Sequence, residues 1–144
     1  MDNIQQSMDL PEIQESDEEK QMTLGQLKYF NAQFARENFQ GRTFINKITM
    51  RQIKVSHDSI AEWRKKSRRR EHVILIRLLD KIIENMIFIS DERDYLERKE
   101  IERASFFKYI CKINNIIYNI SITTRKTLND IDKLRYFSLK QSSK

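Results

Sequence analysis

The densest chemical feature of the chain is a run of cations from residue 64 to 70, where six of seven residues are basic. Like charges three and four residues apart repel on a helix, so this run is costly without an anionic partner. Such runs are typical of nuclear-import signals and of surfaces that contact DNA or RNA phosphates or another polyanion such as a microtubule. A solvated face with no specific partner is the third interpretation. The basic cluster consists of Arg64, Lys65, Lys66, Arg68, Arg69 and Arg70.

Two serines are candidate phosphorylation sites. Ser16 is followed directly by three acidic residues, the pattern that acidophilic kinases favour, and Ser67 follows three basic residues, which suits a basophilic kinase. A phosphate on Ser67 would reduce the positive charge of the basic cluster.

The residues that usually build catalytic or metal sites are scarce. A zinc site needs three or four Cys, His or carboxylate ligands, whereas this chain has one cysteine and two histidines, Cys111, His57 and His72. Neither histidine belongs to an HExxH or Glu-x-x-His arrangement, and Cys111 lies beside an apolar stripe where a small core residue is expected. We therefore predict no enzyme, no catalytic or metal-binding residue, no cofactor and no small-molecule substrate.

The composition then limits the elements that could position these residues. The 144 residues include only Gly25, Gly41 and Pro11 from the glycine and proline classes, which excludes a glycine-rich phosphate loop and a Rossmann fingerprint. From residue 42 to the end there is neither Gly nor Pro, so that stretch is expected to be mostly helical. The sequence therefore predicts an all-α fold.

Capping boxes and apolar spacing indicate where the helices lie. Helices are expected at about 24–39, 57–89, 91–122 and 128–139, with 42–55 open to either strand or helix. Two stripes that alternate steps of four and three residues predict coiled-coil-like seams in an elongated hairpin or a small three- to four-helix bundle. The seams face each other or a partner chain. The first seam is Leu75, Leu79, Ile82, Met86 and Ile89, and the second is Phe106, Ile110, Ile113, Ile117 and Ile120.

The charge divides the chain. The first nineteen residues hold seven acids and no Lys or Arg, so all 27 basic residues follow them, and the formal net charge is +6. An acidic, polar head before a basic body predicts a disordered tail over 1–22. The helical domain is expected over 23–139 and a frayed tail over 140–144.

These observations together predict a non-enzymatic helical scaffold or adaptor subunit of a multiprotein nuclear complex, with a chromosome-associated complex as one such setting. Its partners would be proteins or a second copy, bound through the seams, with DNA, RNA or another polyanion as a further partner and no membrane. The alternatives are a nucleic-acid-binding protein that uses the basic cluster and a cytoskeletal or ciliary scaffold. A lone cysteine and the lack of a signal peptide favour an intracellular location. The basic cluster favours the nucleus, with a cytoplasmic or cytoskeletal location as the alternative.

Overall fold

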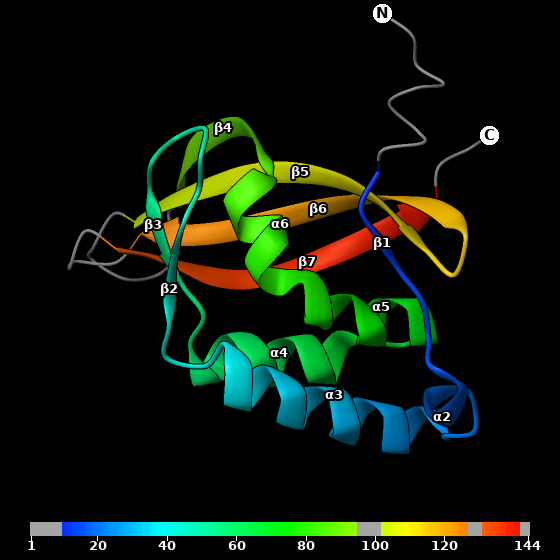
Figure 1. The fold of residues 1–144 in the computed structure, drawn as a ribbon. Helices are drawn as coiled ribbons and strands as arrows, with labels where there is room; N and C mark the ends of the chain where they lie inside the picture. The colour runs from blue at the N-terminus through cyan, green and yellow to red at the C-terminus, as the bar shows by residue number, and fades with distance from the viewer. Residues whose placement is uncertain (1–9, 95–101, 127–130, 142–144) are drawn as a thin grey trace, which may run out of the picture.

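The computed structural model describes residues 10–94, 102–126 and 131–141. It shows a mixed α/β fold in which helices cover one face of a curled seven-stranded sheet (Figure 1). The prediction of an all-α bundle is therefore wrong, as is the prediction of coiled-coil helices over 91–122 and 128–139. Of these expected elements, residues 95–101 and 128–130 lie outside the described residues.

The first part of the chain supplies the helices and three short strands. Thr23 caps the longest helix: its side chain accepts from the backbone N–H of Gln26, whose side chain accepts from the N–H of Thr23. Ser56 and Ser59 form the same reciprocal arrangement at the start of a second helix. The elements are β1 (Glu12–Ile13), α2 (Asp17–Lys20), α3 (Leu24–Asn38), β2 (Thr43–Ile45), β3 (Gln52–Lys54), α4 (His57–Lys66), α5 (Arg70–Ile74), the 3-10 turn η1 (Leu75–Leu78) and α6 (Leu79–Asn85).

The last part of the chain forms a meander of four antiparallel strands. They are β4 (Ile87–Asp94), β5 (Glu102–Ile113), β6 (Ile116–Lys126) and β7 (Asp132–Gln141). The turn between β5 and β6 contains Asn114 and Asn115, both with positive φ (50° and 70°), as a two-residue type I′ turn requires. Asparagine tolerates this conformation, so the hairpin forms without glycine.

The sheet has the strand order β1-β5-β6-β7-β3-β2, and β4 pairs with β5 as well. Two strands therefore share one edge of β5. β4 runs antiparallel to its first half, where Ile87 pairs with Lys108, and β1 runs parallel to its end, where Glu12 pairs with Lys112. At the opposite edge, β3 pairs in parallel with only the first two residues of β7.

The core lies between the sheet and the α5–η1–α6 segment. Alternate residues of β5 and β6 point toward the helices and are buried, in keeping with the period of two of a strand with one solvated face. The first apolar seam packs against them from the helical side as far as Met86, while Ile89 lies in β4 and is 55% exposed. The buried strand residues are Ser105, Phe107, Tyr109, Cys111 and Ile113 in β5, and Tyr118, Ile120, Ile122 and Thr124 in β6.

The second predicted seam is wrong, because its residues lie in strands and are divided between two faces. Ile113 and Ile120 are buried in the core, whereas Ile110 is 41% exposed on the other side of the sheet together with the partly exposed Phe106 and Ile117. A stripe with steps of four and three residues cannot stay on one face of a strand, since every odd step crosses the sheet.

The expected disordered head is ordered from residue 10 onward. Glu15 accepts from Arg70 at 2.7 Å, and the fully buried Glu19 accepts from Arg77 at 2.8 Å. These ion pairs fix β1 and α2 to the helical layer. Residues 1–9 of the expected tail and 142–144 of the expected frayed end lie outside the described residues. Among the described residues, no helix has the length and apolar character needed to cross a membrane.

Candidate functional site

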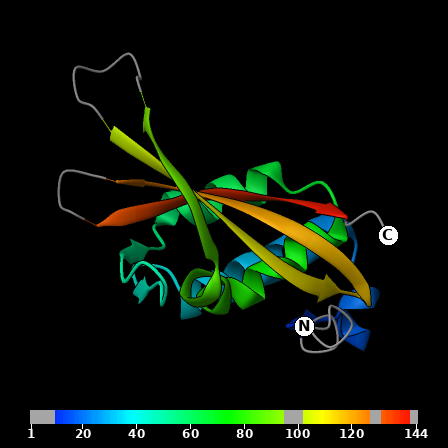
Figure 2. The same ribbon diagram turned by 90° about the horizontal axis from the view of Figure 1, so that it is seen from above.

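The face of the sheet that the helices leave uncovered carries polar and charged side chains in an ordered arrangement. Seen from above in Figure 2, the strands of the meander lie in front of the helical layer. The residues that alternate with the buried ones point to this side, which we call the outer face. It includes Phe106, Lys108, Ile110 and Lys112 of β5, Ile117, Asn119, Ser121, Thr123 and Arg125 of β6, and Lys133, Ser138 and Lys140 of β7.

The strand register places these side chains in rows across the sheet. Lys108 lies beside Ser121, which lies beside Ser138, and the neighbouring row runs from Ile110 through Asn119 to Lys140. Paired residues of neighbouring strands stand about 5 Å apart, so each row forms a continuous surface about 10 Å wide. The rows thus bring together residues that are thirty positions apart in the chain.

Four lysines give the outer face most of its positive charge. Within the described ranges, none of them forms an ion pair, so their ammonium groups are available to an anion in solution. We call them the outer-face lysines: Lys108, Lys112, Lys133 and Lys140.

Small polar groups and apolar groups occupy the positions between the lysines. Asn119, Ser121 and Ser138 are exposed and offer amide and hydroxyl groups. The partly exposed ring of Phe106 lies beside Thr123 in the next row, and Ile110 is 41% exposed. The surface therefore combines cations, hydrogen-bonding groups and an aromatic ring on one sheet.

The basic cluster is divided between the end of α4, a short link and the start of α5. Arg70 is committed to internal contacts, since it donates to Glu15 and to the carbonyls of Glu19 and Met22. Arg69 lies over the ring of Tyr118 at 5.9 Å.

Two further members of the cluster have side-chain contacts within their own segment. Lys66 pairs with Glu62 at 3.3 Å, and Arg68 donates to the carbonyl of Lys65. Arg64 and Arg68 also lie close to Lys28 of α3, where burial, Arg68 and Arg64 lower the pKa of the Lys28 ammonium. The cluster is thus partly a structural connection and partly a positive ridge next to α3.

The two candidate phosphorylation sites lie in opposite environments. Ser16 is exposed at the start of α2, where its Oγ accepts from the N–H of Glu19. Ser67 is fully buried, and its Oγ donates to the carbonyl of Trp63 at 2.8 Å. A kinase can therefore reach Ser16 in the folded chain, whereas Ser67 would first have to leave the core.

Cys111 and the two histidines lie on three different elements. Cys111 is buried in β5, and burial raises the pKa of its thiol to about 12, which keeps it protonated near neutral pH. His57 lies at the start of α4 and His72 in α5. The described residues contain no group of three or more His, Cys, Asp or Glu side chains that could hold a metal ion.

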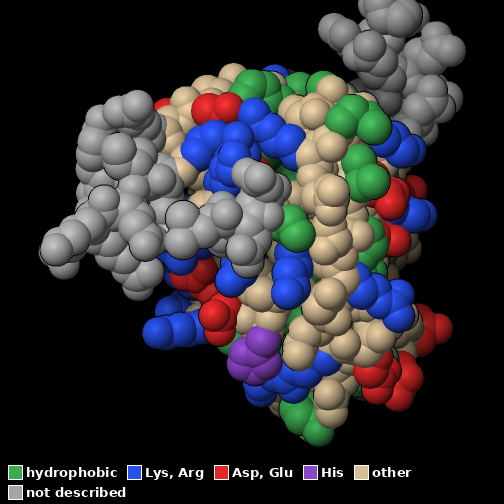
Figure 3. Space-filling view, turned by 90° about the vertical axis from the view of Figure 1, so that its left-hand side faces the viewer, with side chains coloured by type: hydrophobic (Ala, Val, Ile, Leu, Met, Phe, Trp, Pro, Cys, Tyr) green, Lys and Arg blue, Asp and Glu red, His purple; other side chains and the backbone are tan. Residues whose placement is uncertain are grey.

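Arginines and aspartates form a network at one end of the sheet. It lies beside the start of β3, β5 and β7 and the second half of β4. Arg51 donates to Asp91 and to Ser105, and Arg103 donates to Asp132 at 2.7 Å. The hydrogen bond from Arg51, the largest effect, lowers the pKa of Asp91 to about 2. Figure 3 faces this end of the molecule, where Lys and Arg side chains form a patch in the upper part of the view and further ones are spread over the face below it. Because each of these arginines meets a carboxylate, the network serves to hold the strands together.

Sequence reasoning missed the outer face because it read the second half of the chain with a helical period. The signal was present as an alternation: Phe106, Lys108, Ile110 and Lys112 are separated by Phe107, Tyr109 and Cys111. Read with a period of two, this segment has one apolar face and one face that carries lysines.

Comparisons with known proteins give one match. Residues 22–136 match the family described as Large polyvalent protein-associated domain 3. No curated protein and no solved structure matches the chain.

Proposed function

The chain belongs to the Large polyvalent protein-associated domain 3 family, and we propose that it is a non-catalytic domain that binds single-stranded nucleic acid on its outer face. The family description names an association with large polyvalent proteins. A domain that contributes one binding activity among several would suit such an association.

The observation that carries this proposal is the set of four outer-face lysines without ion-pair partners in the described chain. Proteins that bind single strands combine cations that follow the phosphates with aromatic side chains on which bases stack. Phe106 supplies such a ring, and the hydroxyl and amide groups of Ser121 and Asn119 lie where they can contact base edges or sugars.

The shape of the surface favours a single strand over a duplex. Reading the major groove of B-DNA needs a helix or a two-stranded ribbon that enters the groove. All the residues of the outer face belong to adjacent strands of one sheet, and the helices lie on its opposite side (Figures 1 and 2). Unstacked bases can lie on such a surface, whereas a duplex would meet it with its phosphates alone.

A second candidate function, that of an adaptor that docks a partner protein, is favoured by the loop between β2 and β3. Ile48 and Met50 are 57% and 69% exposed there, and Ile45, the last residue of β2, is 49% exposed. The buried Asn46 holds this loop: its Nδ2 donates to the carbonyls of Ile83 and Met86. A fixed loop with large exposed apolar side chains is a suitable anchor for a protein interface. The adaptor role expected from the sequence thus stays a proposal, but the helical seams predicted from the sequence do not support it.

Binding of a short labelled oligo(U) or oligo(dT), followed by fluorescence anisotropy, tests the main proposal. We expect binding that weakens steeply with salt and depends on the outer-face lysines. Binding that depends only on the basic cluster would assign the activity to the ridge beside α3. The nuclear location expected from that cluster stays a prediction, which imaging of the tagged protein would check.

A further inference from the structure

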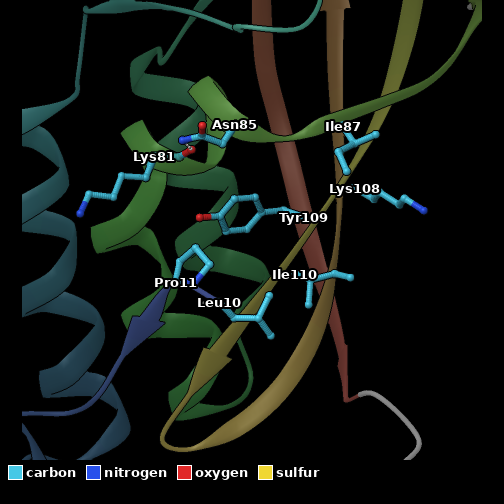
Figure 4. Close-up of a pocket in the computed structure, with 8 residues that line it drawn as sticks. All are labelled: Leu10, Pro11, Lys81, Asn85, Ile87, Lys108, Tyr109 and Ile110. Atoms are coloured by element: carbon cyan, nitrogen blue, oxygen red, sulfur yellow. Dashed lines mark hydrogen bonds between the residues drawn. The ribbon is translucent and has the colours of Figure 1, made fainter. Parts of the chain in front are cut away.

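A cavity of about 530 Å³ opens at the edge of β5, between the end of α6, the start of β4 and the segment Leu10–Pro11 (Figure 4). Its volume lies within the range of small-molecule sites, which is about 300–1,000 Å³. Its walls are mainly apolar, with Leu10, Pro11 and Ile87 around the opening and Tyr109 on the helical side of β5.

The cavity coincides with a gap in the pairing of β5. β4 reaches β5 at Lys108, and β1 meets it at Lys112, four residues or about 14 Å further along the strand. Within the described chain, no strand pairs with Ile110 at this edge. The flanking strands close the gap at both ends, so a compact ligand fits it better than an extended peptide, which could not continue along β5.

Pro11 leaves an acceptor unpaired in this gap. The N–H of Lys112 donates to the carbonyl of Pro11, and the same bond repeats two residues further on, from Asn114 to Ile13. In a parallel ladder with this register, the N–H of residue 11 would donate to the carbonyl of Ile110. Proline has no N–H, and no other group in the described ranges donates to that carbonyl from the cavity side. The Ile110 carbonyl therefore offers a hydrogen bond to a ligand that is a donor.

The surroundings suit an uncharged ligand. Figure 4 shows the ammonium groups of Lys81 and Lys108 directed away from the cavity, so their methylene chains form its wall. Burial, with smaller effects of Cys111 and Asp80, raises the pKa of the Tyr109 hydroxyl to about 12. Surroundings that disfavour a phenolate also disfavour an anionic ligand, and none of the lining residues has a carboxylate that could pair with a cation.

We propose that this cavity binds a small, uncharged aromatic heterocycle that carries an N–H group and has about the size of indole. The N–H donates to the Ile110 carbonyl in place of the missing strand hydrogen bond, and the ring packs against Pro11, Ile87 and Tyr109. A planar ring can lie in the plane of the sheet, where the absent part of the strand would lie. This proposal does not rest on nucleic-acid binding, and its tests leave the outer-face lysines unchanged.

Titration of the full chain with indole and 1-methylindole, followed by calorimetry and by amide NMR shifts, tests the inference. The methyl group replaces the N–H and leaves the ring intact, so 1-methylindole should bind about fivefold more weakly, the effect of losing one hydrogen bond. Indole should also shift the amide nitrogen of Cys111, which belongs to the same peptide group as the Ile110 carbonyl. Equal or tighter binding of 1-methylindole would overturn the proposal.

Charged analogues check the electrostatic part of the argument. Indole-3-acetate and tryptamine carry the same ring with a negative and a positive charge, and both should bind more weakly than indole. Tighter binding of either analogue would contradict an uncharged ligand.

Pro11→Ala tests the acceptor from the protein side. The variant supplies the N–H that can donate to the Ile110 carbonyl, so indole should lose its advantage and bind with about the affinity of 1-methylindole. Thermal melting shows whether the variant is folded. A preference for indole that persists in folded Pro11→Ala would mean that the indole N–H contacts another group, which would refute the assignment.

Two isoleucines of β4 locate the binding site. Ile87 lines the cavity and is 49% exposed, whereas Ile89 lies outside the lining on the same strand and is 55% exposed. Ile87→Ala should lower indole affinity about fivefold, as expected for the loss of about 40 Å² of apolar contact. Ile89→Ala is the matched control and should leave the affinity unchanged. Equal effects of the two changes would indicate general adsorption to apolar surface and would overturn the proposal.

Discussion

The guanidinium of Arg51 meets the carboxylate of Asp91 in a two-point contact, with nitrogen–oxygen distances of 2.9 and 2.8 Å. Ser105 donates to the same carboxylate at 2.6 Å, and the guanidinium lies 5.0 Å from the centre of the Phe88 ring. Arg51 directly precedes β3, while Asp91 and Ser105 lie on β4 and β5. The contact therefore joins the β2–β3 hairpin to β4 and β5. The two-residue pairing of β3 with β7 lies at the opposite edge of the meander.

Acid should weaken this connection in a defined range. The folded-state pKa of Asp91 is about 2, below its ordinary value of 3.8, so its contribution is present above about pH 4. It is lost as the pH falls toward 2, when the folded carboxylate takes up its proton. Its side chain is 34% exposed, and solvent screening limits the contribution to about 1 kcal/mol.

Urea unfolding as a function of pH checks this expectation. Asp91→Asn should lower the free energy of unfolding at neutral pH by about that amount and flatten its dependence on pH between 4 and 2. Glu92→Gln, at an exposed position of the same strand, is the matched control and should leave both unchanged. Equal acid sensitivity of wild type and Asp91→Asn would contradict the assignment.

The attachment of residues 10–22 to the helical layer should depend on the buried carboxylate of Glu19. Glu19 is 1% exposed and accepts from Arg77, from Asn31 and from the N–H of Ser16. Breaking a buried pair leaves the partner charge uncompensated, so Glu19→Gln should cost about 3 kcal/mol and expose the head to limited proteolysis. Glu18→Gln, at the exposed neighbouring position, should do neither.

The loop between β2 and β3 should depend on the side-chain amide of Asn46. Its Oδ1 accepts from the N–H groups of Ile48 and Thr49, while its Nδ2 satisfies two main-chain carbonyls. Asn46→Ala should lower the free energy of unfolding by about 3 kcal/mol, because it leaves these groups without partners. Asn85→Ala removes one exposed bond and should change stability by less than about 0.5 kcal/mol. Equal losses in the two variants would argue against this role.

Nucleic-acid binding should depend on the outer-face lysines more than on the basic cluster. Changing Lys108 and Lys140 to Gln removes two phosphate contacts, so the slope of log affinity against log salt should become shallower by about 1.4 for a single strand. The same change at Lys65 and Lys66 is the matched control and should leave the slope nearly unchanged. The reverse pattern would move the site to the ridge beside α3.

Burial should protect Ser67 from modification. A basophilic kinase should label a synthetic peptide spanning 60–72 but leave Ser67 of the native chain unmodified, as mass spectrometry would show. An acidophilic kinase should reach Ser16, which is exposed. Labelling of native Ser67 at the rate seen in the peptide would show that this segment opens readily.

Local signals in the sequence were sufficient for part of the helical layer. The Thr23–Gln26 capping box coincides with the start of α3, and the stripe from Leu75 to Met86 lies on helical turns that face the core. In both cases the information is local, since caps and helical spacing act within one or two turns.

The strands could not be predicted from local signals, because sheet formation depends on partners that are distant in sequence. Isoleucines and aromatic residues in 102–126 fit both a helical stripe and a strand alternation, and no Gly or Pro separates the two hairpin strands. The Asn114–Asn115 pair was the local sign of a turn. The outer face was hidden for the same reason, since its rows exist only once the register of β5, β6 and β7 is set.

The edge of β5 that β1 and β4 share has a consequence for the order of folding. Glu12 is synthesised about a hundred residues before its partner Lys112, whereas β4 precedes its partner on β5 by fewer than fifteen residues at their nearest. Contacts that close long loops form late, so the meander should assemble first and receive the N-terminal segment as its final strand. β1 is therefore synthesised before the meander and pairs with it afterwards.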